Sequence, residues 1–271
     1  MSLLVFSHGN SFPASTYAVM TASLKKRGFS VKSIEKLGHD PKYPVTDNWP
    51  HMVQQLADFV QRESDKAGQA AYLVGHSLGG ILSLMCAAKH PALVRGVVLM
   101  DAPVIGGWRA SALGAMKTTN LVGRLSPGAV SQHRKQVWAD ADAVYTHFKS
   151  KRTFAMWDDA VLRDYVNHGT HDVQEDGTAK RHLSFDRRIE TQIYNTLPDS
   201  LDRHLKRHPL KCPAAFVGGL QSQEMKTVGT SLTEKVTQGR MAWIDGTHLF
   251  PMENPLAAAA AVEAAICGFA T

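Results

Sequence analysis

Cysteine is scarce in this chain of 271 residues, which contains only Cys86, Cys212 and Cys267. The three are widely spaced, form no C-x-x-C pair, and none lies next to a histidine suited to binding a metal. An odd number of scattered cysteines excludes a disulfide framework and does not suggest a zinc site. We therefore expect buried thiols in a reducing compartment and no metal.

Long apolar runs are also missing. Residues 1–7 are apolar but only as long as a strand, and they carry neither a basic leader nor a cleavage site of small residues. The alanine run at 257–261 is soon interrupted by Glu263 and is too short to span a bilayer. We expect a cytoplasmic protein without membrane contact.

Dense basic tracts are absent as well. The formal net charge of +6 is spread over short groups such as Arg134-Lys135 and Lys151-Arg152. None of these groups alternates with aromatic residues that could stack on bases, so a solvated basic surface explains them better than a nucleic-acid site. We expect no nucleic-acid partner.

What the chain does contain is an alternation of short apolar strands and helices at both of its ends. This pattern predicts strands at 3–6, 29–34, 70–74, 94–100, 214–217 and 241–244, and helices at 16–26, 49–63, 78–89, 223–235 and 255–267. Such alternation requires crossover helices and a mostly parallel sheet covered on both faces. The intervening segment shows helical patches and little strand character. We predict an α/β core, residues 1–102 and 208–271, with a helical cap, residues 103–207, inserted above the sheet.

One motif indicates chemistry directly. The strand at 70–74 runs into the sequence GHSLGG at 75–80 and then into an apolar helix, which is a G-x-S-x-G nucleophile elbow in its strand-turn-helix context. The strained turn leaves no room for a Cβ at Gly75 or Gly79. It exposes the Ser77 hydroxyl at a helix N-terminus, where developing negative charge is stabilised. We predict that Ser77 is a nucleophile.

A serine hydroxyl becomes reactive when an acid holds an adjacent base in one tautomer. In this architecture the base follows the last strand, and here the strand at 241–244 is followed by Asp245-Gly246-Thr247-His248. Most other histidines fall in expected helices or in the cap, where packing or solvent contact explains them better. We predict His248 as the base. Asp245 is too near in sequence to orient the ring and more plausibly makes a turn contact.

Three segments together resemble the α/β-hydrolase superfamily: the elbow, the sequence HGNSFP at 8–13 and the sequence GTHLFP at 246–251. The resemblance covers both ends of the chain and not the cap, and it implies the α/β-hydrolase fold. It also implies an oxyanion hole made by the backbone amides of Asn10 and Leu78. Two fixed N–H donors facing the oxyanion of acyl transfer would contribute roughly 3 kcal/mol each.

The chain departs from the family pattern in two ways. The strand before the oxyanion loop begins near residue 3, so we expect a sheet of about six strands that lacks the first two, with the strand at 29–34 on an edge. The usual acid position, after the strand at 214–217, holds Ser222. Asp101 has the better register, because it leaves its strand on the same side as the elbow. Glu224, two residues beyond the usual position, is the alternative acid.

A serine nucleophile indicates acyl chemistry and excludes the haloalkane dehalogenase reaction, which needs an aspartate. We predict a carboxylic-ester hydrolase in which Ser77 attacks, His248 transfers the proton and Asp101 steadies the imidazolium. A C–C bond hydrolase or a cofactor-free perhydrolase would use the same residues. A non-catalytic small-molecule receptor or scaffold is the alternative from another class, motivated by the displaced acid. No cofactor is implied.

The substrate pocket is expected to be apolar. Phe12 and His76 flank the oxyanion loop and the nucleophile, and the cap offers Trp108 and Trp157 among a group of aromatic residues. The alternative for the cap aromatics is that they pack the cap's own core. The expected partner is a small-molecule substrate, and a homodimer is left open.

Overall fold

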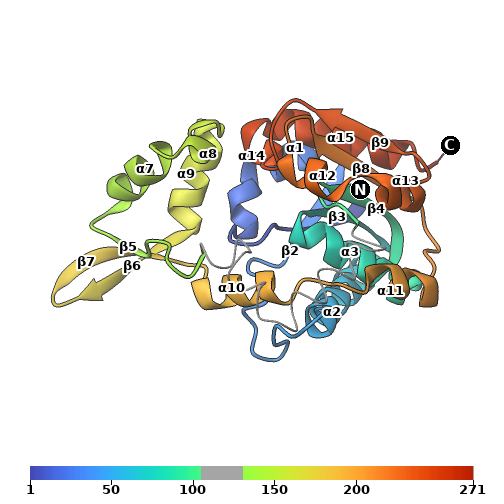
Figure 1. The fold of residues 1–271 in the computed structure, drawn as a ribbon, viewed down its shortest axis with the longest axis horizontal. Coiled ribbons are helices and arrows are strands. Elements are labelled where there is room, and N and C mark those ends of the chain that lie inside the picture. Colours follow the sequence, from blue (N-terminus) through green and yellow to red (C-terminus); the bar gives the residue numbers. More distant parts are fainter. Residues whose placement is uncertain (105–130, 271) are drawn as a thin grey trace.

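The computed structural model describes residues 1–104 and 131–270, and its centre is a six-stranded sheet in the order β2-β1-β3-β4-β8-β9 (Figure 1). Every neighbouring pair in this sheet is parallel. The strands are β1 (Ser2–Ser7), β2 (Phe29–Ser33), β3 (Ala71–His76), β4 (Val94–Met100), β8 (Ala214–Gly219) and β9 (Met241–Ile244). The predicted fold class is confirmed, including the edge position of β2.

The sheet separates two hydrophobic cores because successive strand residues point to opposite faces. In β1, Leu3 and Val5 enter one core, whereas Leu4 and Phe6 enter the other. Helices α2 and α3 cover the first core, and α1 and α15 cover the second. The helices and 3-10 turns of this part are η1 (Ala14–Tyr17), α1 (Ala18–Lys26), α2 (Pro50–Ala67), α3 (Leu78–Lys89), η2 (Pro91–Leu93), α12 (Gln223–Val228), α13 (Ser231–Thr237), α14 (Phe250–Glu253) and α15 (Pro255–Cys267).

Most of these elements lie close to the expected bounds, but the helix expected at 16–26 begins as the 3-10 turn η1 and another expected helix is interrupted. The single helix expected at 223–235 is divided into α12 and α13. Gly229 follows α12 with φ of 79°. A positive φ is incompatible with a right-handed helix, so the chain must stop and restart there.

The segment between β4 and β8 contains both helices and a second sheet, in the order β5-β7-β6. Its described elements are β5 (Val137–Trp138), α7 (Ala141–Lys149), α8 (Arg152–Ala155), α9 (Asp159–His168), β6 (Thr170–Glu175), β7 (Thr178–Leu183), α10 (Arg187–Asn195) and α11 (Leu201–Arg207). The antiparallel pairing of β6 with β7 was not expected. Both strands are mostly polar and only one residue of each is buried, so they lack the apolar alternation that indicates a strand. The cap is therefore mixed α and β and not only helical.

The cap segment packs on the core in two places. Phe148, Trp157 and Tyr165 belong to the same hydrophobic cluster as the residues of α1 and α15. Helix α11 packs against α3 on the other face. Figure 1 shows α7, α8, α9 and the small sheet together at one end of the molecule, with α10 running from them toward the core. The domain boundaries at 102 and 208 stay predictions.

The three cysteines are free thiols. Cys86 is buried in α3 and Cys212 is half-buried, but Cys267 is exposed at the end of α15. The expectation of buried thiols is therefore wrong for Cys267, because the last turn of α15 turns that side chain away from the core. Within the two described ranges, no helix is long and apolar enough to cross a membrane.

Candidate active site

The elbow at Ser77 is a strained turn between β3 and α3. Ser77 has φ of 52° and ψ of −115° and directly precedes the helix. A Cβ on Gly79 would lie 2.0 Å from the carbonyl oxygen of Ser7, and a Cβ on Gly75 would lie 2.2 Å from the carbonyl carbon of Gly79. Both distances are far below van der Waals contact, so only glycine fits at either position.

Strand register brings Ser77 and Asp101 to the same edge of the sheet. His76, the last residue of β3, lies opposite Met100, the last residue of β4. The amide of Ser77 donates to the Met100 carbonyl at 2.9 Å, and the amide of Asp101 donates to the Val217 carbonyl at 2.8 Å. Because parallel strands share one carboxyl edge, the residues that follow them meet there.

His248 lies between these two residues. Its Nε2 is 3.1 Å from the Ser77 Oγ, and its Nδ1 is 2.8 Å from the Asp101 Oδ1. A carboxylate only accepts hydrogen bonds, so neutral His248 carries its proton on Nδ1 and leaves Nε2 free to accept the Ser77 proton. The structure thus brings Ser77, His248 and Asp101 into one chain of hydrogen bonds.

Asp101 is fully buried, and neighbouring groups satisfy its carboxylate. Ser222 Oγ donates to Oδ1 at 2.6 Å, and the Gly219 amide donates to Oδ2 at 2.7 Å. Glu224 competes poorly for the same role, because its side chain is 50% exposed and its Oε2 is 4.0 Å from His248 Nδ1. That separation is beyond hydrogen-bonding distance.

Charges around His248 shift its protonation. Burial alone lowers the pKa of His248, but the hydrogen bond and charge of Asp101 outweigh burial, with smaller contributions from the charges of Glu224 and Glu253. The pKa of His248 is therefore raised above its usual value of 6.5. A raised pKa makes the ring a better proton acceptor.

His76 connects the base to the oxyanion loop. Its Nε2 lies 2.8 Å from the carbonyl oxygen of His248, and its Nδ1 lies 2.7 Å from the Tyr17 hydroxyl. Tyr17 in turn accepts a hydrogen bond of 3.0 Å from the Gly9 amide. Burial lowers the pKa of His76 to about 3, so the ring is neutral and donates from Nε2. Both ring nitrogens are thus engaged within the protein.

One of the two predicted oxyanion donors begins helix α3, and the other lies in the loop after β1. Leu78 is the first residue of α3, so its N–H has no acceptor within the helix. Asn10 is buried in the loop after β1, where its side chain donates from Nδ2 to the Glu190 carbonyl at 3.0 Å. Ser11, the next residue, has φ of 78°. The assignment of both amides to an oxyanion hole stays a prediction.

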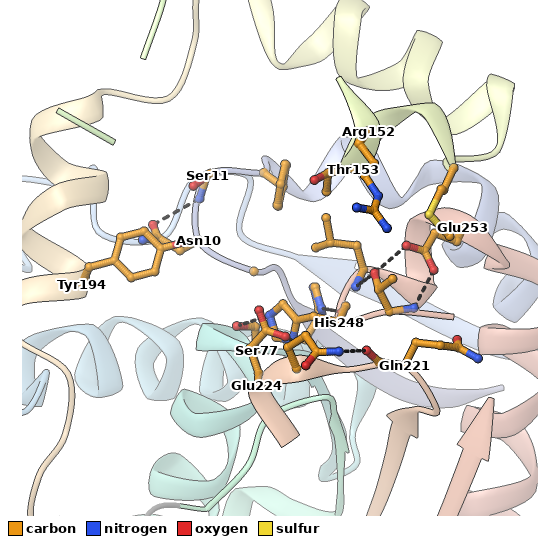
Figure 2. A pocket seen from close by; sticks show the side chains of 17 residues that line it. Asn10, Ser11, Ser77, Arg152, Thr153, Tyr194, Gln221, Glu224, His248 and Glu253 are labelled. Carbon is orange, nitrogen blue, oxygen red and sulfur yellow. Dashed lines mark hydrogen bonds and ion pairs between the residues drawn. The ribbon is translucent and has the colours of Figure 1, made fainter. Parts of the chain in front are cut away.

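A cavity of about 690 Å³ opens over Ser77 and His248. Phe12 and His76, which were expected to line the substrate pocket, are both part of its lining. Figure 2 shows Ser77 and His248 on one side of this cavity and Arg152 and Thr153 on the opposite side. Lining residues that sequence reasoning did not assign to substrate include Arg152, Thr153, Tyr194, Gln221, Gln223, Thr247, Leu249 and Glu253. Those from α8 and α10 carry no local signal, since only the packing of the cap places them there.

The predicted contact of Trp157 with substrate needs correction. Trp157 is 3% exposed and does not line the cavity. Its ring packs against Phe12, with ring centroids 5.3 Å apart, and against Phe154 and Tyr165. It lies one layer behind the cavity wall, because the cap aromatics stack on one another. Trp108 lies outside the described residues.

Asp101, Glu224 and His248 are also a group whose potential ligand atoms lie within 4.8 Å of one another. Nδ1 of His248 is already bonded to Asp101, however, and Nε2 faces Ser77. Hydrogen bonding explains the positions of these groups without a metal. That the site uses no metal or cofactor stays a prediction.

Known proteins are similar to this chain at low sequence identity. A monoglyceride lipase homolog of Monkeypox virus is 25% identical over 166 residues, covering 57% of this chain and 60% of the relative. Monoglyceride lipase of Rattus norvegicus is 24% identical over 149 residues, covering 50% of this chain and 49% of the relative. The chain thus matches about half to three-fifths of the length of these two curated relatives.

The fold is matched over a longer span. The crystal structure of E-2-(acetamidomethylene)succinate hydrolase superposes with a TM-score of 0.74 at 22% identity, covering 98% of this chain and 91% of that one. The sequence profile of the alpha/beta hydrolase family matches residues 4–262. By its sequence over nearly its whole length, and by its fold, this chain belongs to the alpha/beta hydrolase family.

Proposed function

We propose that this protein is a serine hydrolase that cleaves a carboxylic ester of a small, largely apolar molecule through an acyl-enzyme intermediate. The observation that carries the proposal is the continuous path from Ser77 Oγ through His248 to Asp101, with separations of 3.1 and 2.8 Å. Both separations are within hydrogen-bonding distance, as nucleophilic catalysis by serine requires.

In the first half of the reaction, Ser77 Oγ attacks the ester carbonyl carbon while His248 Nε2 takes the hydroxyl proton. The carbonyl oxygen becomes an oxyanion, which the amides of Asn10 and Leu78 bind. When the C–O bond breaks, His248 returns the proton to the leaving alcohol. Asp101 stays ionised and stabilises the imidazolium that forms between these two steps.

In the second half, a water molecule replaces the alcohol. His248 removes a proton from the water as its oxygen attacks the acyl carbon of the Ser77 ester. The second oxyanion collapses, the Ser77 oxygen leaves with the proton from His248, and the carboxylic acid is released. The same base therefore serves both halves, and the raised pKa of His248 suits it to accept each proton.

The cavity supports an ester with an apolar portion. Its volume of about 690 Å³ is in the range that small-molecule sites occupy. Phe12, Met156 and Leu249 contribute apolar surface to its lining, and Arg152 and Glu253 contribute charge. The two curated relatives are named for monoglyceride lipase, and a monoglyceride contains one ester. We extend the ester chemistry, and not that particular substrate, to this chain.

The non-catalytic alternative is less well supported. A receptor that had lost catalysis would have no need of a buried carboxylate aimed at His248, because burying such a group is costly without a function. The C–C hydrolase and perhydrolase alternatives use the same three residues, and only assay of their substrates separates them from the esterase.

We also propose a cytoplasmic location, which the exposed free thiol of Cys267 favours. Cell fractionation that finds the protein outside the cytoplasm would refute this location.

The test is hydrolysis of p-nitrophenyl esters of increasing acyl length. Ser77→Ala should lower kcat/KM by at least about 10³-fold relative to the unmodified protein, since it removes the nucleophile. Ser83→Ala is the matched control, because Ser83 lies buried in the helix that follows the elbow and its hydroxyl has no hydrogen-bond partner among the described residues. Equal rates for the unmodified protein and Ser77→Ala would remove the proposal.

A further inference from the structure

A buried glutamate of the cap holds the oxyanion loop. Glu190, in α10, is 4% exposed. Its Oε1 accepts a hydrogen bond from the Ser11 hydroxyl, and its backbone carbonyl accepts from Asn10 Nδ2 at 3.0 Å. Two consecutive residues of the loop are therefore bonded to one residue that lies 179 and 180 positions away in the chain.

The other carboxylate oxygen of Glu190 is paired with a cation. Arg134 Nη1 lies 2.7 Å from Oε2, and the two side chains are only 14% and 6% exposed. Arg134 Nη2 also donates to the Tyr165 hydroxyl at 2.8 Å, and the Tyr165 ring packs against Phe12, with centroids 5.6 Å apart. The network thus starts in α9 and α10 and ends on both sides of Ser11.

Tyr194 adds a contact from the same helix face. It lies four residues after Glu190, which places it one turn further along α10. Its hydroxyl lies close enough to the side chains of Ser11 and Asn10 to interact with them. Figure 2 shows Tyr194, Asn10 and Ser11 grouped at one end of the cavity, with the bond between the Ser11 amide and the Asn10 side chain marked.

The loop needs such support. Ser11 has φ of 78°, a conformation that residues other than glycine seldom adopt unless neighbouring contacts impose it. Asn10 directly precedes this strained residue. A change of backbone conformation at Ser11 would therefore turn or displace the backbone N–H of Asn10. An oxyanion donor acts only when it is held at hydrogen-bonding distance from the position where the charge develops.

We propose that Glu190, held in place by Arg134, is a positioning residue that fixes the backbone amide of Asn10 in the oxyanion hole. The oxyanion hole is then complete only when α10 is packed against the oxyanion loop. The proposal rests on the proposed function. Glu190 does not line the cavity, so it acts through the loop and does not contact substrate. Specific stabilisation of the transition state, without an effect on ground-state binding, is the signature of this role.

The experiment compares Glu190→Ala, Glu190→Gln and Ser11→Ala in ester hydrolysis and in binding of a trifluoromethyl ketone, which forms an oxyanion on the nucleophile. Glu190→Ala and Ser11→Ala should lower kcat by about 10- to 100-fold with KM within about twofold, and should weaken ketone affinity by the same factor as kcat/KM. Glu190→Gln keeps an acceptor for Ser11 and should fall between them and the unmodified protein. Circular dichroism and Tm report folding.

Glu63→Gln is the matched control. Glu63 is 9% exposed and pairs with Lys66 at 2.7 Å, but it lies in α2, away from the cavity. This variant should leave kcat and ketone affinity unchanged. If Glu190→Ala lowers Tm while kcat and ketone affinity stay as in the control, the role is only structural and the proposal is overturned.

Ser11→Ala keeps the test decisive if Glu190→Ala fails to fold, because it removes one hydroxyl and leaves the ion pair intact. An unchanged kcat in Ser11→Ala overturns the proposal on its own. Failure of the proposed function is a different result: the unmodified protein would then hydrolyse esters no faster than Ser77→Ala, whatever the Glu190 variants do.

Discussion

Ser222 donates a hydrogen bond of 2.6 Å to Asp101 Oδ1, the same oxygen that lies 2.8 Å from His248 Nδ1. Ser222 occupies the place after β8 where the family resemblance would put the acid. Strands β4 and β8 are neighbours, with Met100 opposite Val217, so the residues that follow them lie close together. The residue at the usual acid position thus supports Asp101, the acid that we propose, from the neighbouring strand.

The assignment of the acid predicts a large difference between two variants. Asp101→Asn should lower kcat by about 10³- to 10⁴-fold, because an amide in that place favours the wrong tautomer of His248. Glu224→Gln should change kcat by less than about threefold, since its carboxylate is half-exposed and beyond hydrogen-bonding distance. Steady-state kinetics of both variants decides between them, and the reverse ranking would identify Glu224 as the acid.

Ser222 should contribute less than the acid itself. Ser222→Ala removes one donor from a buried carboxylate, and we expect kcat to fall by about tenfold, corresponding to roughly 1.5 kcal/mol. Ser64→Ala serves as control, because Ser64 is buried in α2 and its hydroxyl has no partner among the described residues. A rate for Ser222→Ala equal to that of Ser64→Ala would mean that Asp101 is oriented without this bond.

The raised pKa of His248 sets the acidic limit of activity. The base is active when neutral, so kcat/KM should fall as the pH drops through a pKa above the ordinary 6.5. Glu224→Gln removes one of the charges that stabilise the imidazolium. It should therefore move the acidic limb of the pH–rate profile, where kcat/KM falls, to lower pH. Glu234→Gln, at an exposed position of α13, should leave the limb in place. A pH–rate profile whose limb moves upward in Glu224→Gln contradicts the account.

The elbow should tolerate no side chain at Gly79. Gly79→Ala places a Cβ 2.0 Å from the Ser7 carbonyl oxygen. Because the clashing atom belongs to the backbone of β1, it cannot move without disturbing the sheet, and we expect the free energy of unfolding to fall by at least about 3 kcal/mol. Gly268→Ala is the control, because its nearest atoms would lie at 3.5 Å and its φ is −67°. Urea denaturation measures both, and equal stability of the two variants would show that the elbow relaxes.

Local sequence pattern was sufficient to predict the sheet and the convergence of the three residues that we propose as the triad. Apolar runs give the strands, and parallel order then puts Ser77, Asp101 and His248 at one edge, because each follows a strand. Asp101 could be preferred over Glu224 from register alone, although the support from Ser222 was not foreseen. Sequence periodicity does not report a hydrogen bond between two loops.

The cap was less predictable, for two physical reasons. The hairpin of β6 and β7 is polar, so only its Asp176-Gly177 turn, with φ of 50° and 75°, signals it. Such a pair is typical of a two-residue hairpin turn and could have been recognised. Glu190 carries no signal of this kind. Its importance comes from contacts with Ser11 and Asn10 that only the folded chain creates.

The proposed mechanism requires that His248 activate the Ser77 hydroxyl and that Ser77 then form a covalent acyl intermediate. The most direct measurement is intact-protein and peptide mass spectrometry after reaction with a fluorophosphonate, with His248→Gln as the comparison. We predict a single adduct on the peptide that contains Ser77, formed about 10³-fold more slowly in His248→Gln. An unlabelled Ser77, or labelling that proceeds at the same rate without His248, would contradict the account.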